Sequence, residues 1–423
     1  MRTQEAVAGN IVKCIISSLS LTSSSTIVHM IRKSPRGLKS SYSRIIFGLS
    51  IGDIITSFAR FVGPFLVPKD SMEASHMAIG TTLSCDYVGF VYFLGVEITS
   101  FYLLFLIYFF WRRVNHGTSP QKFAKGEEKY LHLSIWLGSL ILPSIAVAKK
   151  EMNTVKYGPL CSVHTEPYGC GIGDIGDEGF IPCERGEKAP NTLKLVAVEI
   201  VTVFVCLLIL LCSITYHVYL IERNLSESSK KNSSNNNNDN EEVNARRNSE
   251  EFTENNTPVA NENLNENEAR NFTLTKSSLR QSILYIAAFT CTFAAPLAMA
   301  ASQRIASKTT ALFWINSTLW PMFGNLLLLI YTRPKVQVLS KMFPEASWSY
   351  CFSIVVTSGG EVPPTPQALP VMSGEVHRHR GDSDSESFVS YDDRSTNGEY
   401  YEGLRRSMLA VSRSEEWYNF VQE

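Results

Sequence analysis

The alternation of long apolar runs with segments that are almost entirely polar constrains this chain most strongly. A helix that crosses the hydrocarbon core of a bilayer needs about 20 mainly apolar residues. Because lipid cannot satisfy backbone N–H and C=O groups, such runs are expected to be helical. Seven segments qualify, at 10–31, 44–67, 86–111, 131–148, 193–220, 279–301 and 309–331. The sequence therefore predicts an all-α membrane protein, a seven-transmembrane helix bundle.

The first segment is diluted by serines, among them Ser17, Ser18 and Ser20. Serine is tolerated in a membrane helix because its hydroxyl can bond back to its own helix or across to a neighbour. A signal peptide is the alternative interpretation of this segment. Basic residues follow the run, where a signal peptide would have a cleavage site of small residues, so we expect a spanning helix.

Lysine and arginine gather in the connections after the first, third and seventh segments. An excess of these residues marks the cytoplasmic side, which places the amino terminus outside the cell. The loop 149–192 is then external, although it also carries several basic residues. The expected location is the plasma membrane, with membrane lipid as a partner. The residues that carry this orientation include Arg32, Lys33 and Arg36, then Arg112, Arg113 and Lys122, then Arg333 and Lys335.

Composition divides the chain into four regions. Residues 1–221 hold the first five spans and the outer loop, and 277–343 hold the last two with a short interfacial helix at Pro334–Phe343. Residues 222–276 are rich in Asn, Glu and Ser and are predicted to be a disordered cytoplasmic loop, the third on that side. Residues 344–423 are predicted to be a disordered tail. Kinases are expected to act on cytoplasmic serines such as Ser249, Ser383, Ser385 and Ser387.

Short motifs occur in order along these segments. The second contains Leu49, Ser50 and Asp53, the fourth contains Trp136 and Pro143, and the seventh reads NSTLWP at Asn316, Ser317 and Pro321. The sixth has Phe293 close to Pro296. This set resembles the rhodopsin-like G protein-coupled receptors, and PMFGNLLLLIYTRPK also resembles the divergent receptors of unicellular eukaryotes. The chain departs from the family at Trp320, at Gly324 and at the end of the third segment, which reads YFFWRRV.

The resemblance implies roles for particular residues. Asp53, Thr99, Asn316 and Ser317 would line a pocket for water and a possible bound sodium ion. Pro296, Trp320 and Pro321 would form the helix switch. Arg112 and Arg113 would stand at the surface that couples to a heterotrimeric G protein.

Four cysteines lie at or between segment ends on the predicted outer side. The resemblance implies a disulfide between Cys85 and Cys161, which leaves Cys170 and Cys183 to pair with each other among the three possible connectivities. A zinc site that includes His164 is the alternative, but the spacing fits no standard zinc motif and we expect no metal.

Besides Asp53, the ionisable residues inside apolar segments include Arg60, Glu97 and Glu199, and charges there are costly and usually functional. Arg60 follows Asp53 by two helical turns, so both point to one side of the second helix. Arg60, Glu97 and Glu199 are candidates for a ligand cavity in the outer half. The alternative, which we favour, is an Arg60–Glu97 ion pair that holds the second and third helices together.

These observations favour a G protein-coupled receptor for an unidentified small or peptide ligand. A polytopic transporter lined by the intramembrane charges is the alternative, although no internal repeat is evident. An enzyme is not expected, because the sequence lacks phosphate-binding and nucleophile motifs. No organic cofactor is expected either, because Trp314 stands where a retinal-binding lysine would be needed. No basic patch with interleaved aromatic residues points to nucleic acid.

Overall fold

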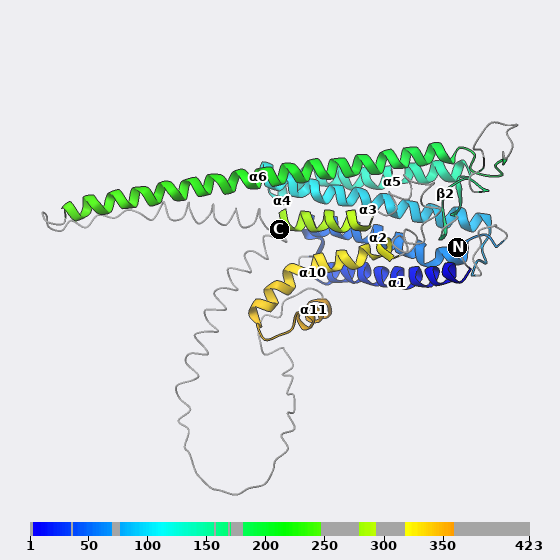
Figure 1. Cartoon of the computed structure of the whole chain (residues 1–423), viewed down its shortest axis with the longest axis horizontal. Coiled ribbons are helices and arrows are strands. Elements are labelled where there is room, and N and C mark those ends of the chain that lie inside the picture. Colours follow the sequence, from blue (N-terminus) through cyan, green and yellow to red (C-terminus); the bar gives the residue numbers. More distant parts are fainter. Residues whose placement is uncertain are drawn as a thin grey trace, which may run out of the picture. The chain divides into compact units, whose positions relative to one another are not determined.

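The computed structural model describes residues 3–34, 37–69, 77–155, 158–167, 170, 181–246, 279–292 and 318–358. Helices account for most of them (Figure 1). The long helices are α1 (Thr3–Lys33), α2 (Ser41–Leu66), α3 (Thr82–His116), α5 (Lys129–Ala148) and α6 (Ala189–Arg246). The shorter elements are η1 (Gly37–Lys39), α4 (Pro120–Phe123), the π-helical turn η2 (Ala124–Glu128), a helix at 279–292, η3 (Trp320–Met322), α10 (Phe323–Met342) and α11 (Trp348–Thr357).

Five helical stretches are long and apolar enough to cross a membrane, so the chain has the character of a membrane protein. They are Val7–Lys33, Ser41–Leu66, Thr82–His116, Pro120–Ala148 and Ala189–Asn224. The predicted spans 279–301 and 309–331 fall partly outside the described residues, and only 279–292 and 318–331 of them are helical here. The count of seven spans therefore stays a prediction.

Glycines allow α2 and α3 to pack at unusually short distance. A Cβ atom on Gly48 would lie 2.3 Å from the ring of Tyr102, and one on Gly52 would lie 2.7 Å from Thr99 Oγ1. From the other side, a Cβ on Gly95 would lie 2.5 Å from Thr56 Oγ1. Small residues spaced by four on facing helices let two backbones approach closely in lipid. We call this contact the glycine seam.

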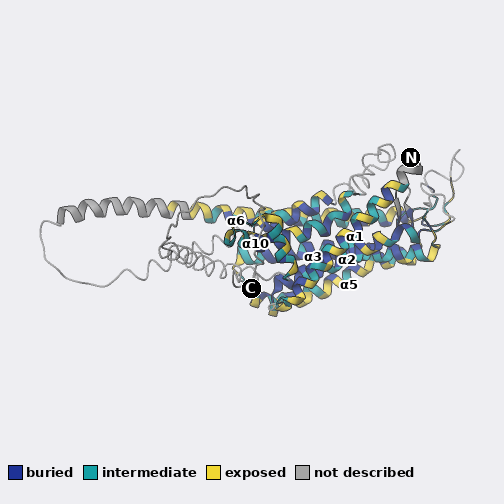
Figure 2. Cartoon of the chain, turned by 90° about the horizontal axis from the view of Figure 1, so that it is seen from below, coloured by how far each residue is buried: buried dark blue, intermediate teal, exposed yellow. Residues whose placement is uncertain are grey.

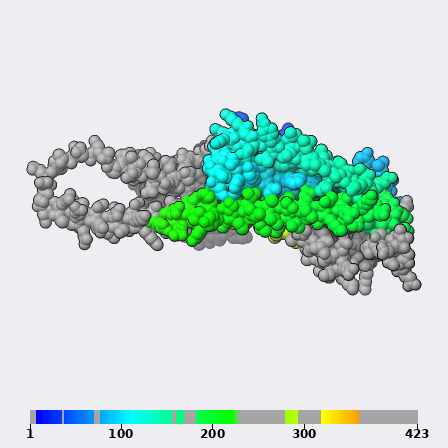
Figure 3. All heavy atoms as spheres, turned by 90° about the horizontal axis from the view of Figure 1, so that it is seen from above, coloured from blue at the N-terminus to red at the C-terminus, as the bar shows by residue number. Residues whose placement is uncertain are grey.

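Apolar side chains cover the outward faces of several helices. On α5, Leu133, Leu137 and Ile141 are exposed, and on α6, Val205 and Ile209 are exposed. Figure 2 shows buried residues where α1, α2 and α3 face one another and exposed residues along the outer edge of α5. Figure 3 shows α6 lying along one face, beside the segments that contain α3 and α5. Exposed apolar faces on long helices suit contact with lipid tails.

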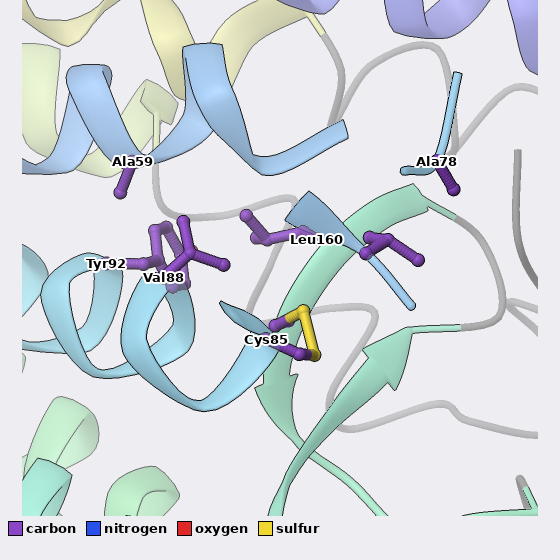
Figure 4. Close-up of a cluster of buried hydrophobic side chains, with 8 residues drawn as sticks. Ala59, Ala78, Cys85, Val88, Tyr92 and Leu160 are labelled. Atoms are coloured by element: carbon purple, nitrogen blue, oxygen red, sulfur yellow. A yellow bond between two sulfur atoms is a disulfide. The ribbon is translucent and has the colours of Figure 1, made fainter. Parts of the chain in front are cut away.

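The segment between α5 and α6 begins with a β-hairpin, which the sequence did not predict. Strands β1 (Met152–Val155) and β2 (Gly158–Val163) are antiparallel, with Met152 opposite Val163 and Thr154 opposite Cys161. The hairpin packs on the start of α3, where Val88, Tyr92 and Leu160 form a buried apolar cluster beside the disulfide of Cys85 (Figure 4). We call this side of the bundle the hairpin end, and the other side the opposite end.

Three predicted boundaries differ from the structure. α6 continues to Arg246, into the predicted disordered loop 222–276, and no Pro or Gly interrupts this stretch; the disordered loop stays a prediction. The predicted disordered tail 344–423 is wrong at α11, an apolar helix that begins at the N-cap Ser347. The predicted interfacial helix Pro334–Phe343 is part of α10, because Pro334 lies inside that helix without ending it. Residues 247–276 and 359–423 lie outside the described residues.

Candidate functional site

A buried carboxylate, Asp53, occupies the centre of the bundle. Its Oδ2 atom accepts hydrogen bonds from Ser24 Oγ at 2.7 Å, Ser20 Oγ at 3.1 Å and Ser57 Oγ at 3.4 Å. Ser20 and Ser24 are one helical turn apart and therefore share a face of α1. The serines that dilute the first apolar segment thus solvate an acid on the neighbouring helix.

The segment around the start of α10 meets the same carboxylate. The backbone N–H of Gly324 donates to Ser20 Oγ at 3.0 Å, which continues the chain of hydrogen bonds to Asp53. Nearby, Ser23 Oγ donates to Asn325 Oδ1 at 2.6 Å. A Cβ on Gly324 would lie 2.3 Å from Asp53 Oδ2, so only glycine fits there without movement. The glycine that departs from the family motif is required by this close approach.

A small cavity of about 10 Å³ lies beside Asp53. That volume is close to the lower limit for one ordered water molecule. Thr99 and Asp53, two of the four residues that the resemblance implies for a pocket, both line it, while Asn316 and Ser317 lie outside the described residues. The full lining is Asp53, Thr56, Arg60, Val96, Thr99, Trp320 and Phe323.

Arg60 closes the cavity toward the hairpin end. Its side chain is only 3% exposed, and its guanidinium carbon lies 4.2 Å from the ring centroid of Trp320 and 5.4 Å from that of Tyr92. These distances are those of cation–π contacts. Neither Arg60 Nη2 nor Tyr92 Oη makes a hydrogen bond of acceptable geometry to any residue that the structure describes.

The favoured Arg60–Glu97 ion pair is wrong. The Glu97 carboxyl lies within hydrogen-bonding reach of Glu199, so this contact joins α3 to α6 and is separate from the cavity. Two carboxyl groups can hydrogen-bond to each other only if one of them carries a proton. The structure thus divides the three predicted ligand-cavity residues between two places, Arg60 at the cavity and Glu97 with Glu199 elsewhere.

The predicted coupling residues lie at the opposite end. Arg112 pairs with Glu127 at 2.5 Å, and Tyr108 Oη donates to the other oxygen of that carboxylate at 2.8 Å. Arg113 is partly buried at the same helix end. Of the predicted switch residues, Pro321 is buried within η3, Trp320 lines the cavity, and Pro296 lies outside the described residues.

Sequence reasoning missed a buried acid, Glu128, at the opposite end. Its carboxylate accepts from Ser41 Oγ and Arg44 Nη2, each at 2.7 Å, and lies 3.4 Å from His132 Nε2. His132 Nδ1 is in turn 2.8 Å from Tyr102 Oη. This network ties α2, α3 and α5 together. The sequence features that could have revealed this network are Glu128 and His132, one helical turn apart, and Ser41 and Arg44, which are three residues apart.

Both predicted disulfides, Cys85–Cys161 and Cys170–Cys183, are present. The hairpin end also carries an ion pair in which Arg185 Nη2 lies 2.7 Å from Asp86 Oδ1. Burial lowers the pKa of His164 to about 4. Burial, the largest effect, raises the pKa of Glu166, and the negative charges of Glu184 and Asp86 also raise it. Within the described part of the chain, no three potential metal ligands lie close enough together to hold an ion.

No protein-family model matches the chain, and no curated protein matches it either.

Proposed function

We propose that the chain is a seven-helix receptor that transmits an extracellular signal to a heterotrimeric G protein. The hairpin end would face the outside of the plasma membrane and the opposite end the cytoplasm. The observation that carries the proposal is the hydrogen-bonded centre at Asp53, which joins three separate segments of the chain. Because those segments meet on one buried carboxylate, a shift of any one of them must disturb the other two.

A receptor of this kind works by population shift, in which a ligand favours one of two helix arrangements. The cavity beside Asp53 provides room for a small rearrangement, and Trp320 and Arg60 both line that cavity and contact each other. A ligand that moves Arg60 or Trp320 from the hairpin end would therefore act directly on the start of α10. This supports a path from the outer surface to the segment that follows η3.

At the opposite end, the proposal assigns G-protein contact to Arg112 and Arg113. The Arg112–Glu127 pair occupies the Arg112 guanidinium in the arrangement described here. In the signalling arrangement this pair would open, since a G protein would need the same surface. The partly exposed positions of both side chains make that opening inexpensive.

A transporter is the second candidate, and the Glu97–Glu199 contact favours it. Paired carboxyl groups inside a membrane are typical of proton or cation pathways. Transport would require these groups to load and release an ion from opposite sides, whereas a receptor needs neither step.

The test measures guanine-nucleotide exchange and sodium-driven flux in the same reconstituted vesicles. We expect the wild-type protein to accelerate basal exchange on added G protein, and Asp53→Asn to change that rate about tenfold, because it removes one buried charge without changing shape. Asp86→Asn is the matched control, because it makes the same chemical change at a partly buried ion pair away from the Asp53 centre. Sodium-driven flux without nucleotide exchange would replace the receptor proposal with the transporter.

A further inference from the structure

We propose that Glu97 on α3 and Glu199 on α6 share one bound proton at neutral pH, and that this proton holds the two helices together. The inference concerns proton binding alone and does not rest on the receptor proposal. It is carried by the register of the two helices, by the apolar surroundings of the two acids and by the positions of the charged groups around them.

The packing of α3 against α6 places the two acids side by side. Both helices begin at the hairpin end and therefore run in the same direction. Toward the opposite end, Trp111 Nε1 donates to Ser213 Oγ at 3.0 Å. Glu97 precedes Trp111 by 14 residues, which is about four helical turns, and Glu199 precedes Ser213 by the same number. One register thus brings Glu97 next to Glu199, and their carboxyl groups lie within hydrogen-bonding reach.

The surroundings of the pair are apolar. Glu97 is only 6% exposed and Glu199 is partly buried. About one turn nearer the hairpin end, Phe93 of α3 and Val196 of α6 belong to one buried apolar cluster, against which Ile200 also packs. Two ionised carboxylates at this place would lack most of their hydration and would repel each other. One of the two acids therefore gains from remaining protonated.

No basic side chain among the described residues neutralises the pair, because neither acid takes part in any of the ion pairs there. Asp53 and Arg60 on α2 line the small cavity, which meets a different face of α3. On α6, Lys194 is exposed and more than one turn away from Glu199. The ionisable groups of α5 and the hairpin are Lys129 and Lys149 at the two ends of α5, His132 bonded to Tyr102, and Glu151 and His164 at the hairpin.

A proton suits this pair better than a metal ion. A protonated carboxyl group donates one hydrogen bond and an ionised one accepts it, so two acids sharing one proton satisfy each other. A metal ion would need further ligands, and within the part of the chain that the structure describes no third Asp, Glu, His or Cys lies close enough to supply one. Since the hydrogen bond joins α3 to α6, its loss with the proton would loosen the contact between them.

Infrared spectroscopy of the full-length protein in lipid vesicles at pH 7 detects the proton directly. A protonated carboxyl group has a C=O stretching band that a carboxylate lacks and that shifts in heavy water. We expect Glu97→Gln and Glu199→Gln each to reduce this band by the intensity of a single carboxyl group, because the amide N–H replaces the shared proton. A reduction in only one variant would assign the proton to that residue alone and overturn the proposal. No reduction in either would show that both acids are ionised, which also overturns it.

Thermal unfolding in detergent tests the link between the helices. Glu199→Gln should change Tm by less than about 1 °C, because its amide can still donate to Glu97, whereas Glu199→Ala should lower Tm by about 3 °C. Glu127→Gln is the matched control, since it makes the same chemical change at an ion pair and should leave the infrared band unchanged. A rise of several degrees in Glu199→Gln would mean that it separates two like charges, and would refute the shared proton. If Glu97→Gln does not fold, Glu199→Gln decides in both measurements.

Discussion

Glu128 at the opposite end and Arg60 at the hairpin end are both buried ionisable residues, but they differ in their hydrogen-bond partners. Glu128 receives hydrogen bonds from Ser41 and Arg44 and lies close to His132. Arg60 makes cation–π contacts with Trp320 and Tyr92, while one of its nitrogen atoms has no acceptor among the described residues. Glu128 thus finds its hydrogen-bond partners inside the protein, whereas Arg60 finds only some of its own.

The difference separates a structural role from a functional one. A buried ion pair with complete hydrogen bonding resists change, because removing one partner leaves the other uncompensated. A buried charge with an open donor retains binding capacity for something outside the chain. We therefore expect Glu128 to hold the opposite end together and Arg60 to contribute little to stability, and the following variants test that division.

The largest loss of stability is expected from Glu128→Ala. It leaves Arg44 without its acid and removes the bond to Ser41, which should lower the free energy of unfolding by roughly 2–3 kcal/mol; Arg44 is partly exposed and can recover some hydration. Reversible denaturation in detergent measures this value. The neighbouring variant Glu127→Ala is the control, because its more exposed pair with Arg112 should contribute less than about 1 kcal/mol. Equal losses in both variants would contradict the structural role of Glu128.

Gly324→Ala tests the contact between Asp53 and the start of α10. The added methyl group would lie 2.3 Å from Asp53 Oδ2 and 2.5 Å from both Ser20 Oγ and Ser24 Oγ, so it must push the segments apart. We expect a loss of about 2 kcal/mol, typical of overpacking. Gly138→Ala on α5 is the control, since a Cβ there meets nothing within 4 Å. A Gly324→Ala protein as stable as the control would show that this close approach is not required.

His164 is a further ionisable group for the comparison, and unlike Glu128 and Arg60 it is kept neutral by burial. Its pKa falls from an ordinary value of 6.5 to about 4, so its contribution to stability is complete above pH 6.5 and is lost as pH falls toward 4. Tm should therefore decrease by a few degrees between pH 7 and pH 5. His164→Gln should remove part of that decrease, whereas His116→Gln, at an exposed position, should not. Identical pH profiles for the wild type and His164→Gln would refute this assignment.

The smallest change in stability is expected from Arg60→Gln. Losing the cation–π contacts with Trp320 and Tyr92 costs stability, but removing an incompletely bonded charge restores it, so the net change should lie within about 1 kcal/mol of zero. A loss as large as that of Glu128→Ala would show that Arg60 is a structural residue like Glu128.

Much of the helical organisation follows from the sequence. Five apolar runs became helices because their length and hydropathy leave few alternatives in lipid. The resemblance implied a common pocket for Asp53 and Thr99, and both residues line the small cavity. The β-hairpin was not predictable from a helical pattern, because it depends on packing against the start of α3. The extension of α6 to Arg246 was missed because the polar composition of 222–246 was given more weight than its lack of Pro and Gly.

The partner of Arg60 was predicted wrongly for a geometric reason. Val96 and Thr99 line the cavity from one face of α3. Glu97 follows Val96 directly and is therefore turned by about 100° around the helix axis, toward α6. Their positions inside neighbouring apolar segments had suggested an ion pair between Arg60 and Glu97, but the angular position of a residue around its helix decides which neighbour its side chain meets. The Glu128 network was missed since its members are spread over three helices.

The glycine seam between α2 and α3 has a mechanical consequence. Where a methyl group would already collide with Tyr102, Thr99 or Thr56, the two helices have almost no freedom to slide past each other. The two helices therefore form a rigid unit within the bundle. This unit includes Asp53 and Arg60 on α2 and the disulfide-bonded Cys85 on α3. Relative movement within the bundle is then expected in the elements outside this pair, such as α6 or the segment that begins at Trp320, while Asp53 and Arg60 keep their places on α2.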